Sequence, residues 1–273
     1  DLFSCSILII NTKKGGIEMV IINGKTYYGN VNIVNGRVVG EDSDDNCHPQ
    51  KIDKRKTENC NGIKKINIRS NSAVRVCAES ERKDIVAHLH GYVEGNAEPK
   101  FSVTRKGDEL SITVESSSSN GNGSISTISM GSVVINTSGS NGNLILEVMI
   151  PSYTFEEIAI DSKNANIDVT DTVNAESINI DSKNGNVDVS ATFQHLSINN
   201  KNGNIDVDST ARSDVKLDIT SKNGNIDVSV DNIGNAKVFV ENKNGICKNR
   251  PRLKGKYTAY GSIISKNGNL RFK

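Results

Sequence analysis

The sequence predicts an all-β protein built as a single-stranded parallel β-helix (a β-solenoid) with about 20 residues per rung. One twelve-residue pattern occurs four times, at residues 158–169, 178–189, 196–207 and 217–228, and two weaker copies follow. The lysine of this pattern recurs at positions 163, 183, 201, 222, 243 and 266, so the copies are 20, 18, 21, 21 and 23 residues apart. Composition agrees: a thin core of Ile, Val and Leu needs few large rings, and the 273 residues include no Trp, six Phe and six Tyr.

Each copy consists of two short strands joined by a polar corner. In the second copy, Ile178 and Ile180 alternate with polar residues, and so do Val187 and Val189, which is the period of a half-buried strand. The Ser-Lys-Asn-Gly-Asn segment between them provides Asn-Gly for a positive φ at a tight corner. A plain β-hairpin is the competing interpretation. We favour a coil of parallel strands because its corners would stack about 4.8 Å apart, which explains why they are nearly identical.

Four segments are expected along the chain. Residues 1–18 form a leader whose membership of the native protein is left open, and its Cys5 is a weak candidate for lipid attachment. Residues 19–40 contain two Asn-Gly pairs between β-branched residues, which predicts short strands that cap the solenoid. Residues 41–61 are charged without periodicity and predict a linker. The solenoid itself is expected to span residues 62–273.

Neither the charge nor the cysteine content indicates a nucleic-acid-binding, disulfide-linked or zinc-binding protein. The formal net charge of +1 carries no general bias toward nucleic acid or acidic membranes, and we expect no specific nucleic-acid binding. No run approaches the roughly 20 apolar residues of a transmembrane helix. The five cysteines show no Cys-x-x-Cys spacing, so neither a disulfide framework nor a zinc site is indicated. We expect no cofactor.

Histidines and acidic residues are weak candidates for metal binding. His88 and His90 lie two residues apart and so share one face of a strand. No third ligand is evident beside them, and we expect a solvated pair. The acidic run at residues 41–46 lacks the spacing of a calcium loop. The sequence therefore predicts no metal site.

The corners predict a ladder of asparagine side chains, with amides bonded from rung to rung. Its members are Asn164, Asn184, Asn202, Asn223, Asn244 and Asn267. We expect this ladder to be structural.

An outward column of aspartates is also expected, formed by Asp168, Asp188, Asp206 and Asp227. Carboxylates one rung apart repel each other, which raises their pKa values unless another charge compensates. We expect Lys183, Lys201 and Lys222 to compensate together with solvent, and bound divalent cations are the alternative.

A basic segment interrupts the repeat after Gly245. Its charged residues fall on alternate positions, so an extended backbone would place them on one face. We call this set the basic strip: Lys248, Arg250, Arg252, Lys254 and Lys256, beside Tyr257 and Tyr260. It is a candidate site for a sulfated or phosphorylated polymer, anionic lipid headgroups or nucleic acid, and a solvated loop is the plainer interpretation.

The block Leu146-Glu-Val-Met-Ile-Pro-Ser-Tyr, followed by Ser-Lys-Asn-Gly-Asn-Ile-Asp-Val copies, resembles a bacterial adhesin family whose domains are called head GIN or adhesin-like domains. The resemblance covers roughly residues 62–273. It implies a right-handed parallel β-helix in a protein of the bacterial surface or envelope. It transfers no catalytic residues, and the chain shows no clear signal peptide, so a cytoplasmic location is left open.

The function expected from these observations is non-enzymatic. The four histidines lie scattered, and no nucleophile–His–Asp constellation, phosphate loop or metal triad is legible. We expect an adhesin-like solenoid that acts as a binding surface, with a cell-surface glycan or another anionic polymer as partner. The alternative is a self-assembling scaffold, in which homo-oligomeric contacts matter and ligands do not.

Overall fold

The computed structural model describes residues 50–93, 98–115 and 144–273 in full, together with the backbone of nine further strands between residues 7 and 138. The chain divides into two compact units, residues 1–47 and 48–273. Cys5 and the acidic run at residues 41–46 lie outside the described residues. In the described part of the chain, no helix is long and apolar enough to cross a membrane.

The first unit contains short antiparallel strands. A three-stranded sheet is formed by β1 (Ile7–Ile9), β4 (Met19–Ile22) and β5 (Lys25–Tyr28). Two separate pairs are β2 (Thr12–Lys13) with β3 (Gly16–Ile17) and β6 (Ile33–Val34) with β7 (Arg37–Val38). The two Asn-Gly pairs themselves lie outside the described residues. Their expected role as a cap of the solenoid stays a prediction.

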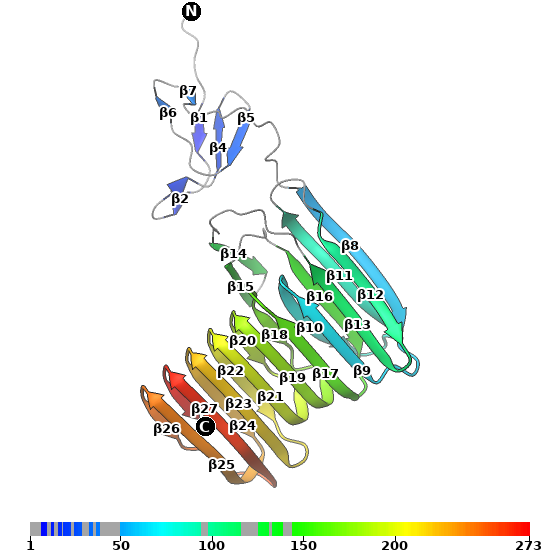
Figure 1. Cartoon of the computed structure of the whole chain (residues 1–273), viewed down its shortest axis with the longest axis vertical. Helices are drawn as coiled ribbons and strands as arrows, with labels where there is room; N and C mark the ends of the chain where they lie inside the picture. The colour runs from blue at the N-terminus through cyan, green and yellow to red at the C-terminus, as the bar shows by residue number, and fades with distance from the viewer. Residues whose placement is uncertain are drawn as a thin grey trace, which may run out of the picture. The chain divides into compact units, whose positions relative to one another are not determined.

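The second unit is all-β and consists mainly of two mixed sheets (Figure 1). The nine-stranded sheet has the order β12 (Lys100–Lys106), β13 (Glu109–Glu115), β9 (Lys65–Ser70), β17 (Phe155–Ser162), β19 (Asn174–Asn184), β21 (Thr192–Asn202), β23 (Val215–Asn223), β27 (Tyr257–Asn267) and β25 (Ile233–Asn244). The ten-stranded sheet has the order β26 (Cys247–Asn249), β28 (Leu270–Phe272), β24 (Ile226–Asp231), β22 (Ile205–Thr210), β20 (Val187–Val189), β18 (Ile167–Val169), β10 (Ala73–Glu79), β16 (Ile145–Pro151), β11 (Asp84–Val93) and β8 (Gln50–Asn59). A separate two-stranded sheet pairs β14 (Ile125–Met130) antiparallel with β15 (Val133–Ser138).

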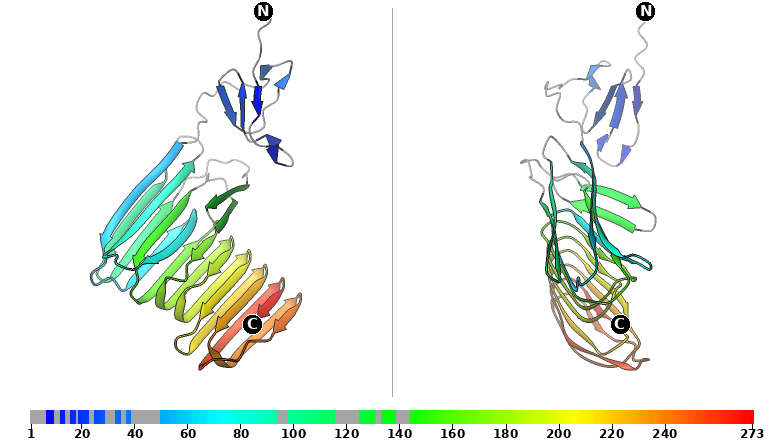
Figure 2. Two further views of the ribbon diagram at one scale, coloured as in Figure 1. Left: turned by 180° about the vertical axis from the view of Figure 1, so that it is seen from behind. Right: turned by 90° about the vertical axis from the view of Figure 1, so that its right-hand side faces the viewer.

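The repeats form rungs, each with one strand in either sheet and a tight corner between them. From β17 to β24 the chain alternates between the sheets, and each strand pairs in parallel with its counterpart in the next rung. Equivalent residues are in register, so that Ile178 pairs with Ile158 on one side and with Leu196 on the other. The two sheets face each other across the core in the right-hand view of Figure 2. The two strands that flank a corner therefore do not pair with each other as a hairpin. Each pairs in parallel with the equivalent strand of the neighbouring rung.

The core lies between the sheets and follows the predicted alternation. In β23, Val215, Leu217 and Ile219 are buried, while the residues between them are partly exposed. Apolar rows of this kind continue from rung to rung. Each rung therefore depends on its neighbours to bury its apolar side chains.

The end of the second unit nearest the N-terminus departs from the regular coil. Strand β11 pairs antiparallel with both β16 and β8, and β12 pairs antiparallel with β13. Strand β8 also occupies part of the stretch predicted as a charged linker. Ile52 is its buried residue, and its many charged residues are typical of an edge strand that is protected from further pairing.

The rungs nearest the C-terminus are not stacked in chain order. Strand β27 lies between β23 and β25, and β28 lies between β24 and β26. The later rung therefore fills the space between two earlier ones. The order in which the last two rungs stack therefore differs from their order in the chain.

Candidate functional site

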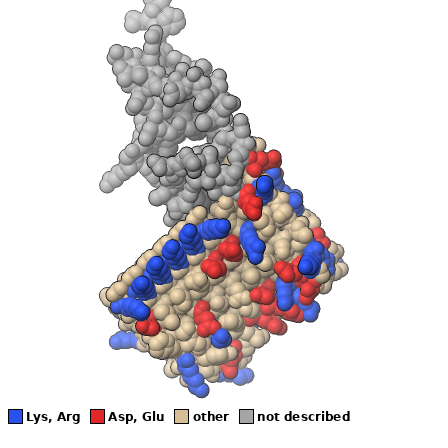
Figure 3. All heavy atoms as spheres, viewed as in Figure 1, with Lys and Arg blue, Asp and Glu red and all other residues tan. Residues whose placement is uncertain are grey.

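The repeat lysines form a single exposed row along one edge of the second unit, which we call the lysine column. Strand register places its members one rung apart in the order Lys163, Lys183, Lys201, Lys222, Lys266 and Lys243. All six side chains are exposed. Figure 3 shows the row as a continuous line of basic side chains. Five steps of about 4.8 Å give the column a length of about 24 Å.

The lysine column is only partly balanced by nearby negative charge. In the described part of the chain, none of its six lysines forms an ion pair within 4.0 Å. An acidic residue precedes three of the six lysines by two positions, and neutral residues take that position in the other three rungs. The acidic residues are Asp161, Asp181 and Glu241, and the neutral ones are Asn199, Thr220 and Ile264. Like charges held one rung apart repel each other. An anion that bridges neighbouring lysines would relieve this repulsion.

The asparagines next to the lysines form a hydrogen-bonded row. Each side-chain amide donates to the Oδ1 atom of the preceding asparagine, over distances of 2.6–2.8 Å. The order along the row is Asn164, Asn184, Asn202, Asn223, Asn267 and Asn244, which follows the stacking of the strands and not the chain. The row holds each lysine backbone at a defined spacing from the next.

A second asparagine row, which the sequence did not single out, lies two residues further along. The Oδ1 atom of Asn186 accepts the backbone N–H of Asn204 at 3.0 Å, and Asn204 accepts that of Asn225 at 3.0 Å. In the corners that carry both asparagines, each of the two is hydrogen-bonded to a neighbouring rung. This double attachment accounts for the near-identity of the corners.

The aspartate column lies on the other sheet, away from the lysines expected to compensate it. Lysines of the column end the strands of the nine-stranded sheet, whereas the aspartates lie on the ten-stranded sheet beyond the corner. The expected pairing with Lys183, Lys201 and Lys222 is therefore wrong. Compensation comes from the ends of the column, where Arg75 Nε is 3.5 Å from Asp168 and Lys273 Nζ is 2.7 Å from Asp227.

Among the described residues, Asp188 and Asp206 in the middle of the aspartate column form no ion pair within 4.0 Å. Desolvation and the neighbouring carboxylates of Asp206 and Asp168 raise the pKa of Asp188 to about 6. Desolvation and Asp227 also raise the pKa of Asp206. These two carboxyl groups therefore take up protons at a higher pH than an isolated aspartate does, which for Asp188 means near pH 6.

The basic strip does not form an extended strand. Lys248 belongs to β26, but residues 250–256 connect β26 to β27 without strand structure. The Lys254 N–H donates to the carbonyl of Arg252 at 3.1 Å, a tight turn that breaks the alternation assumed from the sequence. Its five basic residues are exposed, and the ammonium of Lys256 lies 5.7 Å from the ring centre of Tyr257. Tyr260 is exposed on β27.

The lysine column could have been found in the sequence, since the same lysine recurs in every corner. Sequence spacing does not show on which sheet a residue lies after a corner, so the lysines cannot be separated from the aspartates without the structure. The structure separates the two columns and leaves the lysines unpaired among the described residues.

Comparison with known proteins identifies relatives of the second unit. The family model described as Toastrack DUF4097 matches residues 63–259. A structure described as a "putative cell adhesion protein" from Clostridium sporogenes aligns with a TM-score of 0.52 and 16% identity, over 82% of this chain and 99% of that one. A "putative adhesin" from Bacteroides fragilis aligns with a TM-score of 0.43 and 14% identity, over 81% and 98% of the two chains. No curated protein matches the sequence. The first of these structures supports the fold, and no residue role follows from either.

Proposed function

The chain belongs to the Toastrack DUF4097 family, and from that premise we propose that it acts as a non-enzymatic, adhesin-like binding surface for a linear anionic polymer. The adhesion names of the structural neighbours favour a binding role. The lysine column is the observation that carries the proposal. We likewise propose that the rungs wind as one right-handed parallel β-helix, as the family resemblance implies. A location at the cell surface stays a prediction from the same resemblance.

The geometry of the lysine column suits a polymer better than a small ligand. Six ammonium groups lie in a line of about 24 Å on a backbone held by parallel strands and two asparagine rows. A flat row of this kind offers no enclosed cavity, but it matches an extended chain that carries charge at short, regular intervals. Sulfated polysaccharides and phosphate-linked polymers both have that chemistry. Each bound polymer charge would release counterions, so binding should weaken strongly with salt.

The test is to replace Lys183, Lys201, Lys222 and Lys266 together by glutamine and to measure binding of dextran sulfate, polyphosphate and neutral dextran. Each Lys or Arg near an anionic surface contributes about 1 kcal/mol, so the loss of four should weaken binding roughly 1,000-fold at low salt. The dependence of log K on log salt should become shallower by about 3. Neutral dextran should not bind either protein. A preference between the two anionic polymers would identify the source of the charge.

A matched control removes the same charge from the basic strip. The variant with glutamine at Lys248, Arg250, Arg252 and Lys254 is expected to keep most of the affinity, because residues 250–256 do not form an extended row. If this variant loses binding and the variant of the lysine column keeps it, the polymer site belongs to the basic strip and not to the column. If the intact protein binds neither polyanion at low salt, the proposal fails.

A self-assembling scaffold is the second candidate function, and the open sheet edges near the C-terminus favour it. Among the described strands, β25 and β26 each have a partner on one side alone. Phe239 on β25 is 60% exposed, and Ile246 beside β26 is 62% exposed. Unpaired strands with exposed apolar residues are prone to pair with another chain.

Light scattering over a concentration series tests this second candidate. Self-association should increase with concentration and fall when Phe239 and Ile246 are both replaced by serine. The lysine-column variant serves as its control, because it leaves these edges unchanged. A strictly monomeric protein at high concentration would remove the scaffold function while leaving polymer binding unaffected.

A further inference from the structure

Three neighbouring strands of the ten-stranded sheet bring two histidines and two carboxylates to one outer face. His88 and His90 project outward from β11, because Leu89 between them points into the core and is fully buried. Glu147 of β16 lies directly opposite His88 in the antiparallel pairing of these strands. Asp53 of β8 lies opposite His90 on the other side of β11. The sequence places Glu147 almost 60 residues from the histidines, so only strand pairing reveals the group.

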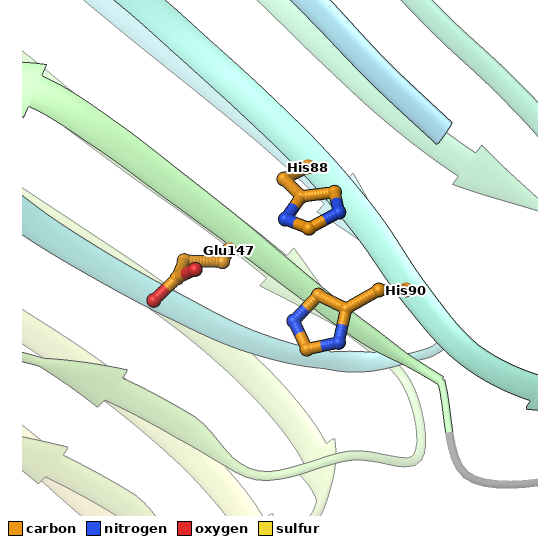
Figure 4. A group of neighbouring side chains, drawn as sticks. All are labelled: His88, His90 and Glu147. Carbon is orange, nitrogen blue, oxygen red and sulfur yellow. The ribbon is translucent and has the colours of Figure 1, made fainter. Parts of the chain in front are cut away.

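The two histidines and Glu147 are close enough to share one ion. Each offers one ligand atom, and these three atoms lie within 4.8 Å of one another. All three side chains are half-buried, and the two imidazole centres are 4.6 Å apart. In Figure 4, each ring turns one nitrogen toward the side on which Glu147 lies. Zinc bonds of about 2.0–2.2 Å to N and O place tetrahedral ligands roughly 3.3–3.6 Å apart, so small side-chain rotations would close the site.

A metal-binding histidine usually donates its second ring N–H to a carboxylate or a carbonyl group, and Asp53 provides such a carboxylate for His88. His88 Nε2 lies 2.8 Å from Asp53 Oδ1, so a neutral His88 donates its Nε2–H to this carboxylate. The nitrogen that remains for a metal is Nδ1. A carboxylate in this position fixes the tautomer and ring orientation of a ligand and raises its basicity.

The surrounding charges leave the Glu147 carboxylate available. Arg75 of β10 is its neighbour in the strand register, but the Nε atom of Arg75 lies 3.5 Å from Asp168. Arg55 faces the group from β8, opposite His88, and is exposed. The carboxylates of Asp53 and Glu147 therefore lie among basic neighbours, Lys51 and Arg55 on β8 and Arg75 on β10, so a divalent cation enters a site of mixed charge.

We propose that His88, His90 and Glu147 bind one zinc ion, or a similar divalent transition-metal ion, with Asp53 orienting His88. Imidazole nitrogen with one carboxylate oxygen is a ligand set that suits zinc, copper, nickel and iron. The ion would join β11 to β16, and so connect the antiparallel end of the second unit to the parallel rungs. Because the ligands come together only in the folded chain, metal binding should stabilise the fold.

The experiment is a zinc titration of the full chain, free of purification tags and previously treated with a chelator, followed by calorimetry. One zinc ion per chain is expected. His90→Ala and Glu147→Gln should each weaken binding more than 100-fold, and Asp53→Asn should weaken it about 10–100-fold. Zinc should raise the thermal unfolding temperature of the wild type and not that of Glu147→Gln. Circular dichroism in the presence of chelator would establish that each variant is folded.

His195→Ala is the matched control. This imidazole is also partly exposed and also lies near a carboxylate, with Nε2 3.2 Å from Asp218, but the structure shows no third ligand group with it among the described residues. Its removal should leave zinc binding unchanged.

Cobalt absorption separates the proposed site from binding by thiols. The described residues include three free cysteines, Cys60, Cys77 and Cys247. The proposed ligands should give d–d bands without thiolate charge-transfer bands. Thiolate bands, no binding of zinc in excess, or binding that survives both His90→Ala and Glu147→Gln would overturn the proposal.

Discussion

Replacing Gly203 by alanine is expected to lower the free energy of unfolding by about 2–6 kcal/mol, the sum of backbone strain and overpacking. Gly203 has a φ of +131°, which side chains rarely permit. A Cβ atom there would lie 2.0 Å from the carbonyl oxygen of Gly185 in the neighbouring rung. The corners touch backbone to backbone, so neither atom can rotate away. Urea unfolding at a fixed temperature measures the effect.

Gly107→Ala is the control for this prediction. Gly107 also has a positive φ, +65°, but no atom lies within 4 Å of the position that a Cβ would occupy. Its cost should therefore be conformational alone, about 1–2 kcal/mol. Equal losses in the two variants would show that the corner moves to accept the methyl group, and that close stacking does not require glycine.

The first corner shows how the same motif accepts a side chain. Ala165 stands where the later copies carry glycine, and it is not among the described non-glycine residues with positive φ. Its methyl group is buried against Ala73 and Ile145 of the preceding part of the sheet. Glycine is thus needed where one regular corner stacks on another, and not where the stack begins.

Deleting residues 257–273 is expected to release two rungs and not one. Removal of a terminal repeat from an ordinary solenoid leaves the preceding repeat paired with its inner neighbour. Here β25 pairs with β27 among the described strands, and β26 pairs with β28. Amide hydrogens of Ile233–Asn244 should lose their exchange protection in the truncated protein, while those of β21 and β23 keep most of theirs. Retained protection in β25 would show that it has moved into the vacant place beside β23.

Gly261 explains why β25 should not make that move. Gly261 of β27 has a φ of +116°, and a Cβ there would lie 2.2 Å from the carbonyl oxygen of Leu217 in β23. The corresponding residue of β25 is Val238. Gly261→Val in the full chain should therefore reproduce the loss of exchange protection in β25 and β27. Thr258→Val in the same strand should change stability by less than about 1 kcal/mol, as a substitution near the surface does.

The strands of the regular rungs could be predicted from residues 158–228 because each strand carries its own alternation. Ile178, Ile180, Val187 and Val189 are buried as the period requires. The edge strand β8 could not be predicted in this way, since Ile52 is its one buried residue and a strand at an edge needs little apolar surface.

The candidate sites likewise differ in how far the sequence predicts them. The sequence shows that the lysines recur, but it does not show which residues lie near them, because the sheet on which a residue lies after a corner depends on the fold. The proximity of Glu147 to His88 could not be predicted from the sequence, because it arises from the antiparallel pairing of β11 with β16.

The all-β class, the rung length and the corner residues can be predicted from the sequence, because these depend on local periodicity and on repetition. The order of the final rungs, the antiparallel end of the sheets and the group formed by His88, His90 and Glu147 follow only from contacts made in the folded chain. Hydrogen bonding between strands is nearly the same for any sequence, so the choice of partner depends on side chains that meet only after folding. Gly261 against Leu217 is such a contact, and it allows β27 rather than β25 to pack beside β23.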